Sequence, residues 1–213
     1  KYKSPILFFS LEMSKEQLIY RLLANETNIN NTRLKVGNIK NSEWKILNKT
    51  IKKLATLPFF IDDLPNLLIT NIRSKIKKII FEHNKIGLVI IDYLQLMESG
   101  SLKNENRVQE LSQITRALKN IAREFEIPII VLSQLSRSVE SRINKRPILS
   151  DLRESGSIEQ DSDLVIMLYR DDYYNNNTEE PDIAELIIAK HRNGPIGSIK
   201  LNFSPKLTKF TNV

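Results

Sequence analysis

The sequence predicts an α/β protein whose parallel-stranded sheet is flanked by helices and followed by a C-terminal β-hairpin. Short, fully apolar runs at residues 87–91 and 127–132 indicate buried strands. Longer stretches such as residues 105–125 repeat apolar side chains at helical spacing. Residues 183–189 and 198–203 flank a loop rich in turn-forming residues, which is typical of a hairpin. Strands that are buried on both faces and separated by helices need crossover connections, which give parallel pairing.

Each element of this fold has its own signal along the chain. A capping-box spelling places Ser14 three residues before Gln17 and predicts the start of the first helix. In chain order, we expect a strand at 5–9, helices at 14–23, 42–55 and 70–83, a strand at 87–91, a helix at 105–125, strands at 127–132 and 163–169, the hairpin, and a short last strand at 208–211. No internal repeat or second domain is evident, so we expect one domain over residues 1–213.

Composition limits the classes of function. Hydrophobic residues make up 41% of the chain and charged residues 27%, as in ordinary globular domains with a core. The sequence has no cysteine and two histidines, which excludes disulfides, thiolate metal sites and a histidine metal cluster. Its apolar runs are too short to span a bilayer, so we expect no membrane partner. Abundant lysine, isoleucine and asparagine, all favoured by AT-rich codons, point to an AT-rich bacterial or organellar genome.

The formal charge of +7 fits a nucleic-acid partner but does not establish one. The surplus of basic residues lies in the first 90 residues, mainly in lysine-rich stretches at 45–53 and 75–85. Their helical spacing favours solvated helix faces over a track for DNA. Composition alone therefore leaves the partner open.

Three polar side chains, those of Glu12, Asp92 and Gln134, each come just after a predicted strand. Because ligands bind at the carboxyl ends of parallel strands, we expect them at one edge of the sheet. An apolar strand that closes on aspartate is the Walker B pattern, whose carboxylate helps to hold Mg²⁺. Glu12 would then be the base that activates water, and Gln134 the amide that contacts a γ-phosphate. The alternative is that polar residues simply mark strand ends.

Five segments extend this pattern into a family resemblance. They are FSLEMS at 9–14, IIDYLQLM at 90–97, LSQLSR at 132–137, DLRESGSIEQD at 151–161 and IAKHRNGPIG at 188–197. Each resembles a signature segment of the DnaB replicative helicases, and together they follow the family's order along nearly the whole chain. The resemblance implies a RecA-like fold, a homo-hexameric ring, ATP and Mg²⁺ as cofactors, and movement along single-stranded DNA. It also implies primase and helicase-loader partners, and a location in the bacterial cytoplasm or the plastid stroma.

The resemblance also gives individual residues roles in nucleotide chemistry. Glu12 matches the catalytic base, Asp92 the Walker B carboxylate that holds the metal, and Gln134 the sensor of the third helicase motif. Arg21 matches an arginine that reaches the bound nucleotide. The alternative for Arg21 is an ordinary solvated arginine on a helix.

Lys190 and Arg192 are expected to act together. They lie two residues apart near the end of a predicted strand, so their side chains should project to the same side. In the resembled family this pair completes the ATP site of the neighbouring subunit as an arginine finger. The alternative is a solvated strand end.

Arg153, Glu154 and Gly156 match the family's pore loop, which holds DNA phosphates. Arg153 would supply positive charge, and Gly156 would let the backbone approach a phosphate. The alternative is a structural pairing of Arg153 with Glu154 or Asp151. At Glu98 the chain departs from relatives that carry basic pore residues there, which puts a second DNA loop in doubt.

The family's phosphate-binding loop, G-x-x-x-x-G-K-S/T, normally precedes the strand that corresponds to residues 5–9. No such motif occurs in these 213 residues. We therefore expect a motor core that is incomplete at its N-terminus, without the strand and helix of that loop or the N-terminal collar domain, and inactive in isolation. One alternative is the non-catalytic half of a split RecA-like ATPase. Another is a recombinase or clock-type ATPase of the same fold, but the segment at 151–161 belongs to the helicase branch.

Overall fold

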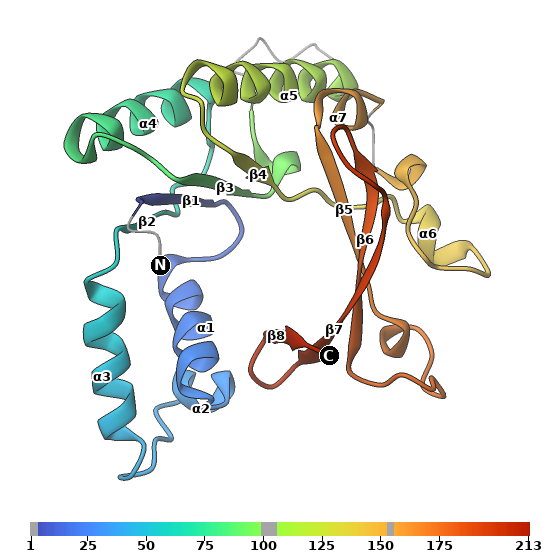
Figure 1. Ribbon diagram of the computed structural model, residues 1–213. Coiled ribbons are helices and arrows are strands. Elements are labelled where there is room, and N and C mark those ends of the chain that lie inside the picture. Colours follow the sequence, from blue (N-terminus) through green and yellow to red (C-terminus); the bar gives the residue numbers. More distant parts are fainter. Residues whose placement is uncertain (1–3, 99–105, 153–155) are drawn as a thin grey trace. The chain divides into compact units, whose positions relative to one another are not determined.

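The computed structural model describes residues 4–98, 106–152 and 156–213 (Figure 1). The chain forms two compact units that interleave along the sequence. The parallel-sheet unit comprises Lys1–Lys15, Leu57–Arg137 and Ser150–Ser162. The antiparallel-sheet unit comprises Glu16–Thr56, Ser138–Leu149 and Asp163–Val213. Among the described residues, no helix has both the length and the apolar character needed to cross a membrane.

The parallel-sheet unit is built on four strands in the order β2-β1-β3-β4, and every pair is parallel. Its elements are β1 (Ile6–Ser10), β2 (Phe59–Asp62), α4 (Ile69–His83), β3 (Leu88–Asp92), the 3-10 helix η1 (Leu94–Leu96), α5 (Arg107–Glu124), β4 (Ile129–Val131), the 3-10 helix η2 (Leu149–Asp151) and α7 (Gly156–Asp161). The long helices α4 and α5 lie along the same face of this sheet (Figure 1). The predicted parallel sheet flanked by helices is thus confirmed.

The core of this unit lies between the sheet and those two helices. In α5 the buried residues Leu111, Ile114, Leu118 and Ile121 recur every three or four positions and form one apolar stripe. Alternate residues of β1 and β3 and the isoleucines of α4 meet this stripe in one cluster. Burying each such side chain stabilises the fold by about 1.5–3 kcal/mol. The helix begins where the side chain of Asn106 accepts a hydrogen bond from the amide of Val108.

The antiparallel-sheet unit combines a small helical cluster with a four-stranded sheet in the order β5-β6-β7-β8. Its elements are α1 (Lys15–Thr27), α2 (Asn31–Lys35), α3 (Trp44–Ala55), α6 (Ser138–Ser141), β5 (Leu164–Tyr169), the 3-10 helix η3 (Asp171–Tyr173), β6 (Ile183–His191), β7 (Gly197–Ser204) and β8 (Lys209–Asn212). The hairpin of β6 and β7 and the short last strand confirm the prediction for the C-terminal end. In the hairpin turn, a Cβ at Gly194 would lie 2.4 Å from Cε1 of His191, so any larger residue there would require the exposed His191 ring to move.

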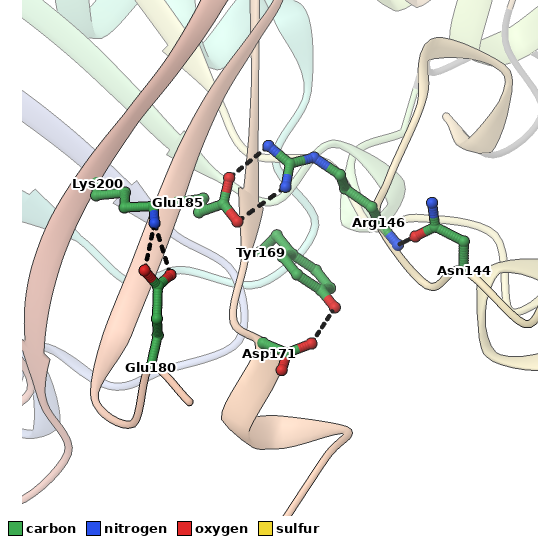
Figure 2. A network of polar contacts seen from close by, with 7 residues as sticks. All are labelled: Asn144, Arg146, Tyr169, Asp171, Glu180, Glu185 and Lys200. Carbon is green, nitrogen blue, oxygen red and sulfur yellow. Dashed lines mark hydrogen bonds and ion pairs between the residues drawn. The ribbon is translucent and has the colours of Figure 1, made fainter. Parts of the chain in front are cut away.

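A polar network secures the segment before η2 to this sheet (Figure 2). The guanidinium of Arg146 forms a bidentate ion pair with Glu185 of β6, with Nη1 2.8 Å from Oε1. It also lies 5.9 Å from the ring centre of Tyr169. Burial and a hydrogen bond donated to Asp171 raise the pKa of Tyr169 to about 12, so its hydroxyl remains protonated and keeps donating. The network therefore fixes this segment by directional contacts as well as by packing.

One strand was not predicted, and one expectation about a strand is wrong. The unpredicted strand is β2, whose four residues between Pro58 and Asp63 are too few to give a clear pattern. The strand at 163–169 was expected in the parallel sheet, but β5 pairs antiparallel with β6. Its burial alternates: Val165 and Met167 are buried, whereas Leu168 is 58% exposed. An apolar sequence on both faces of a strand thus does not fix the direction of its neighbours.

Candidate functional site

The carboxyl ends of β1, β3 and β4 meet at one edge of the parallel sheet, which we call the carboxyl edge. Ser10 pairs in register with Asp92, and the amide of Leu11 donates to the carbonyl oxygen of Asp92 at 2.7 Å. Beyond β4, the carbonyl oxygen of Leu132 accepts a hydrogen bond from the amide of Leu94 at 2.9 Å. Adjacent strands lie about 5 Å apart, so the segments that carry Glu12, Asp92 and Gln134 are close neighbours. The predicted convergence of these three residues is present.

Glu12 lies in a turn whose two ends are held. Ser10 is 1% exposed, and its hydroxyl donates to the carbonyl oxygen of Met13 at 2.6 Å. The amide of Lys15 donates to Oδ2 of Asp63 at 3.0 Å, and this hydrogen bond lowers the pKa of Asp63. Asp63 thus stays a carboxylate where α1 begins. Glu12 itself is exposed, so its carboxylate can reach a bound ligand or water.

Asp92 fits a metal ion that arrives with a ligand. It is the last residue of β3 and is half-buried. Within residues 4–98, 106–152 and 156–213, no three His, Cys, Asp or Glu side chains group so as to hold a metal by themselves. Mg²⁺ typically uses one or two carboxylates together with phosphate oxygens and water. The donor set at the carboxyl edge therefore suits a nucleotide-bound Mg²⁺ better than a permanent metal site.

Gln134 is exposed just beyond β4, and its backbone contacts a residue that sequence analysis did not single out. The amide of Gln134 donates to Oε1 of Gln95 at 3.2 Å. Gln95 lies in η1, within the same IIDYLQLM segment as Asp92. Its only sequence signal was membership of that segment, because its partner is 39 positions away.

The predicted DNA loop lies only partly within the described residues: Gly156 does, whereas Arg153 and Glu154 do not. Gly156 is the first residue of α7, and a Cβ there would meet no described heavy atom within 4 Å. On one side of the loop, the carbonyl oxygen of Asp151 accepts a hydrogen bond from the amide of Ser136 at 2.7 Å. On the other, the hydroxyl of Thr115 in α5 donates to Asp161 at 2.6 Å. Both flanks are therefore fixed to the parallel-sheet unit.

Lys190 and Arg192 lie in the antiparallel-sheet unit. Lys190 pairs in register with Val165, and β6 runs to His191, two residues beyond the predicted 183–189, so Lys190 lies in the strand and Arg192 directly follows it. Nη1 of Arg192 lies 3.1 Å from Oδ1 of Asp163, and their side chains are 47% and 56% exposed. Such exposed ion pairs contribute little, about 0–1 kcal/mol. Asp163 therefore orients Arg192 without holding it strongly.

Arg21 also belongs to the antiparallel-sheet unit, in α1, and is exposed. Its carbonyl oxygen accepts a hydrogen bond from the side chain of Asn25 at 3.2 Å. This position is compatible with both readings of Arg21, a nucleotide contact and a solvated helix residue.

A parallel sheet of this strand order, followed by C-terminal antiparallel strands, defines a RecA-like α/β protein. A solved RadB recombinase shares this fold with a TM-score of 0.50 at 15% identity, over 99% of this chain and 80% of that one. The model of the DnaB-like helicase C terminal domain matches residues 1–212, and the chain belongs to that family. The resemblance inferred from the five segments is therefore confirmed.

Individual relatives agree with this family. A probable replicative DNA helicase of Trieres chinensis is 68% identical over 99% of this chain and 47% of its own length. The replicative DNA helicase DnaB of Geobacillus stearothermophilus is 48% identical over 100% of this chain and 47% of its own length. A solved structure described as an ATPase domain has a TM-score of 0.95 at 40% identity, over 99% of this chain and 75% of that domain. The chain thus spans about half the length of the curated relatives it matches.

Proposed function

We propose that this chain forms part of an ATP-dependent replicative DNA helicase, a hexameric ring that unwinds duplex DNA while it moves along single-stranded DNA. The observation that carries the proposal is the convergence of Glu12, Asp92 and Gln134 at the carboxyl edge of a chain of this family. Two carboxylates and an amide are the groups that ATP hydrolysis needs besides a grip on the phosphates.

Each of the three residues has a separate task in this proposal. Mg²⁺, when bound with ATP, neutralises charge on the phosphate oxygens. Asp92 provides the carboxylate that holds the metal. Glu12, exposed in a turn held at both ends, orients the attacking water and accepts its proton. Gln134 donates to the γ-phosphate and so distinguishes ATP from ADP.

Residues of the antiparallel-sheet unit complete the proposed chemistry. Lys190 and Arg192 act on ATP held by the neighbouring subunit, where they stabilise the charge that develops during phosphoryl transfer. The weak ion pair of Arg192 with Asp163 supports this, because a phosphate can displace an exposed carboxylate at little cost. Arg21 is proposed to reach the bound nucleotide.

Contact with single-stranded DNA is assigned to Arg153, Glu154 and Gly156. The support is that both flanks of this loop are fixed to the parallel-sheet unit, one of them by Ser136, two residues after Gln134. Primase and a helicase loader are proposed as partners of the ring. A solved DnaB-like replicative helicase described with its primase interactions has a TM-score of 0.94 to this chain at 40% identity. Relatives in Geobacillus stearothermophilus and Trieres chinensis support a bacterial cytoplasm or plastid stroma as the location.

The phosphate-binding loop must come from outside these residues. In the parallel-sheet unit, β4 pairs with β3 on one side, and no described strand pairs with its other side. Ile130 in β4 is 48% exposed, and Leu132 just beyond the strand is 44% exposed. We propose that a segment bearing the phosphate loop adds to the parallel sheet beside β4. This chain covers 75% of the solved ATPase domain, so a quarter of that domain has no counterpart here. The competing proposal is a non-catalytic half of a split ATPase that works only after such complementation.

The test joins this chain to the upstream half of the Trieres chinensis relative and measures unwinding of a forked DNA with ATP and Mg²⁺. We expect unwinding by the joined protein, and single-stranded DNA should stimulate its ATP hydrolysis. Arg153→Ala should remove that stimulation while basal hydrolysis persists, whereas Arg123→Ala on α5 serves as a control with the same change of charge. A joined, folded protein that hydrolyses ATP but never unwinds DNA would contradict the helicase assignment.

A further inference from the structure

The side-chain amide of Gln95 bridges the ends of two strands at the carboxyl edge. Its Nε2 donates to the hydroxyl oxygen of Ser133 at 2.9 Å, and its Oε1 accepts from the amide of Gln134 at 3.2 Å. A longer contact of 3.5 Å joins Nε2 to the carbonyl oxygen of Gln134. Both the donor and the acceptor of the amide are therefore used on consecutive residues after β4.

The backbone of Gln95 is itself held in place. Nη2 of Arg107, the first residue of α5, donates to the carbonyl oxygen of Gln95 at 2.8 Å and to that of Met97 at 3.2 Å. Nη1 of the same guanidinium forms an ion pair with Glu110 one turn further along α5. Leu94, just before Gln95, and Met97, two residues after it, are each 1% exposed. Gln95, fixed in this way, holds the residues after β4 in place relative to α5 and β3.

The side chain of Gln134 contrasts with its backbone. Among the described residues, the side-chain amide of Gln134 makes no hydrogen bond, and Gln134 is exposed. The point from which this side chain extends is therefore set by its own backbone, which Gln95 holds. The same contacts leave the Gln134 amide available for a ligand.

We propose that Gln95 is a positioning residue for the proposed ATP hydrolysis: it holds the backbone of Ser133 and Gln134 so that the side chain of Gln134 meets the γ-phosphate. This inference rests on the proposed role of Gln134. Pre-organisation of a donor matters because a shift of about 1 Å at a catalytic group can cost a hundredfold in rate. Gln95 itself touches neither nucleotide nor water in this mechanism.

The first test needs only the chain itself. Gln95→Met keeps the length of the side chain and removes both polar atoms, and Gln109→Met makes the same change on the exposed side of α5. Amide hydrogen exchange at Gln134 should become faster in Gln95→Met and stay unchanged in Gln109→Met. Unchanged amide exchange at Gln134 in both variants would show that Gln95 does not hold the backbone of Gln134. Ser133→Ala, which removes the hydroxyl acceptor and leaves Gln95 intact, provides a second route if Gln95→Met does not fold.

The second test uses the joined protein. Gln95→Met should lower kcat about tenfold and change the Kd for ATP by less than about twofold, because it disturbs a contact used mainly in the reaction. Adding Gln95→Met to Gln134→Ala should cause no further loss, since the two residues form one unit. If the fold-loss of kcat in the double variant equals the product of the two single fold-losses, the two residues act independently. That result would overturn the inference and leave the sensor role of Gln134 intact. If Gln134→Ala alone leaves kcat unchanged, the sensor role fails, and the inference fails with it.

Discussion

Glu12 lies in the turn after β1 and Asp92 ends the adjacent strand β3, and the two carboxylates have different surroundings. Glu12 is exposed in a turn held by the Ser10 hydroxyl and by Asp63, whereas Asp92 is half-buried at the end of β3. A carboxylate that only handles water can lose its charge without disturbing nucleotide affinity. A carboxylate that holds a metal cannot, because it contributes to binding before the reaction begins.

Glu12→Gln should therefore separate binding from chemistry in the joined protein. We expect an unchanged Kd for Mg²⁺-ATP and a fall in kcat of about 10²–10⁴-fold, the usual contribution of a general base. Asp92→Asn should weaken Mg²⁺-dependent binding as well. Equilibrium titration with a fluorescent ATP analogue and steady-state hydrolysis measure the two quantities. Identical effects of both variants on affinity and rate would refute this division of labour.

Arg192→Ala tests whether the finger acts across a subunit interface. Nucleotide binding should stay nearly intact, and hydrolysis should fall about a thousandfold, as for other arginine fingers. Rings mixed from Arg192→Ala and Glu12→Gln subunits should regain part of the activity, since some interfaces then combine an intact glutamate with an intact arginine. Mixed rings that form but stay inactive would place Arg192 in the site of its own subunit.

The connection between α2 and α3 depends on one charged pair. Arg33 forms a bidentate contact with Glu43, with Nη1 2.9 Å from Oε1, and the amide of Lys40 donates to the same carboxylate at 2.8 Å. The hydrogen bond from Arg33 is the main reason that the pKa of Glu43 falls from 4.5 to about 2. Because the pKa is lower in the folded state, the pair contributes stability above pH 4.5 and loses it as the pH falls towards about 2.

Glu43→Gln should thus lower Tm by a few degrees at pH 6 and by progressively less as the pH falls from 4.5 to about 2. Thermal unfolding followed by circular dichroism at several pH values measures this difference. Glu179→Gln, which changes an exposed carboxylate in the loop before β6, should show no such trend. A Tm difference that is equal at about pH 6 and about pH 2.5 would rule out the charged pair as its cause.

Among the elements, those with long or fully buried patterns could be predicted from sequence. The apolar stripe of α5 and the buried run of β3 specify their structure locally, and both were found within two residues of the expected bounds. The short strand β2 and the direction of β5 depend on which strand lies alongside, which no local pattern encodes. Tertiary pairing likewise decides where β6 ends, and so where Arg192 leaves the strand.

The candidate site shows the same division. Glu12, Asp92 and Gln134 were predictable because strand ends meet at one edge of a parallel sheet. Gln95 was not, because its role comes from a contact with a residue far away in sequence. Asp63 was missed for the same reason, because the Lys15 amide that donates a hydrogen bond to it lies 48 positions away in the sequence.

At the scale of the whole molecule, the chain contains the proposed residues Glu12, Asp92 and Gln134, but its sequence has no G-x-x-x-x-G-K-S/T motif to bind phosphates. A phosphate loop supplies backbone amides and a lysine that bind the β- and γ-phosphates. At the carboxyl edge, Glu12 and Asp92 are instead negative and repel a nucleotide that lacks this grip.

The chain of residues 1–213 alone should therefore show no steady-state ATP hydrolysis and only weak ATP binding, whereas the joined protein should do both. A coupled-enzyme ATPase assay and isothermal titration calorimetry at matched Mg²⁺ concentrations compare the two proteins. Glu12→Gln in each background excludes a contaminating ATPase. Hydrolysis by the chain alone that disappears with Glu12→Gln would show that a phosphate loop is not required.

The open side of β4 also affects how the chain behaves in solution. Among the described residues, no strand pairs with the outer edge of β4, and the nearby side chains of Ile130 and Leu132 are exposed. Such an edge is a template for any extended peptide, including the same edge of another copy. The net charge of +7 disfavours such association at low salt, but screening weakens this protection as ionic strength rises. Salt-induced aggregation of the chain would therefore be relieved by a peptide that pairs with the edge.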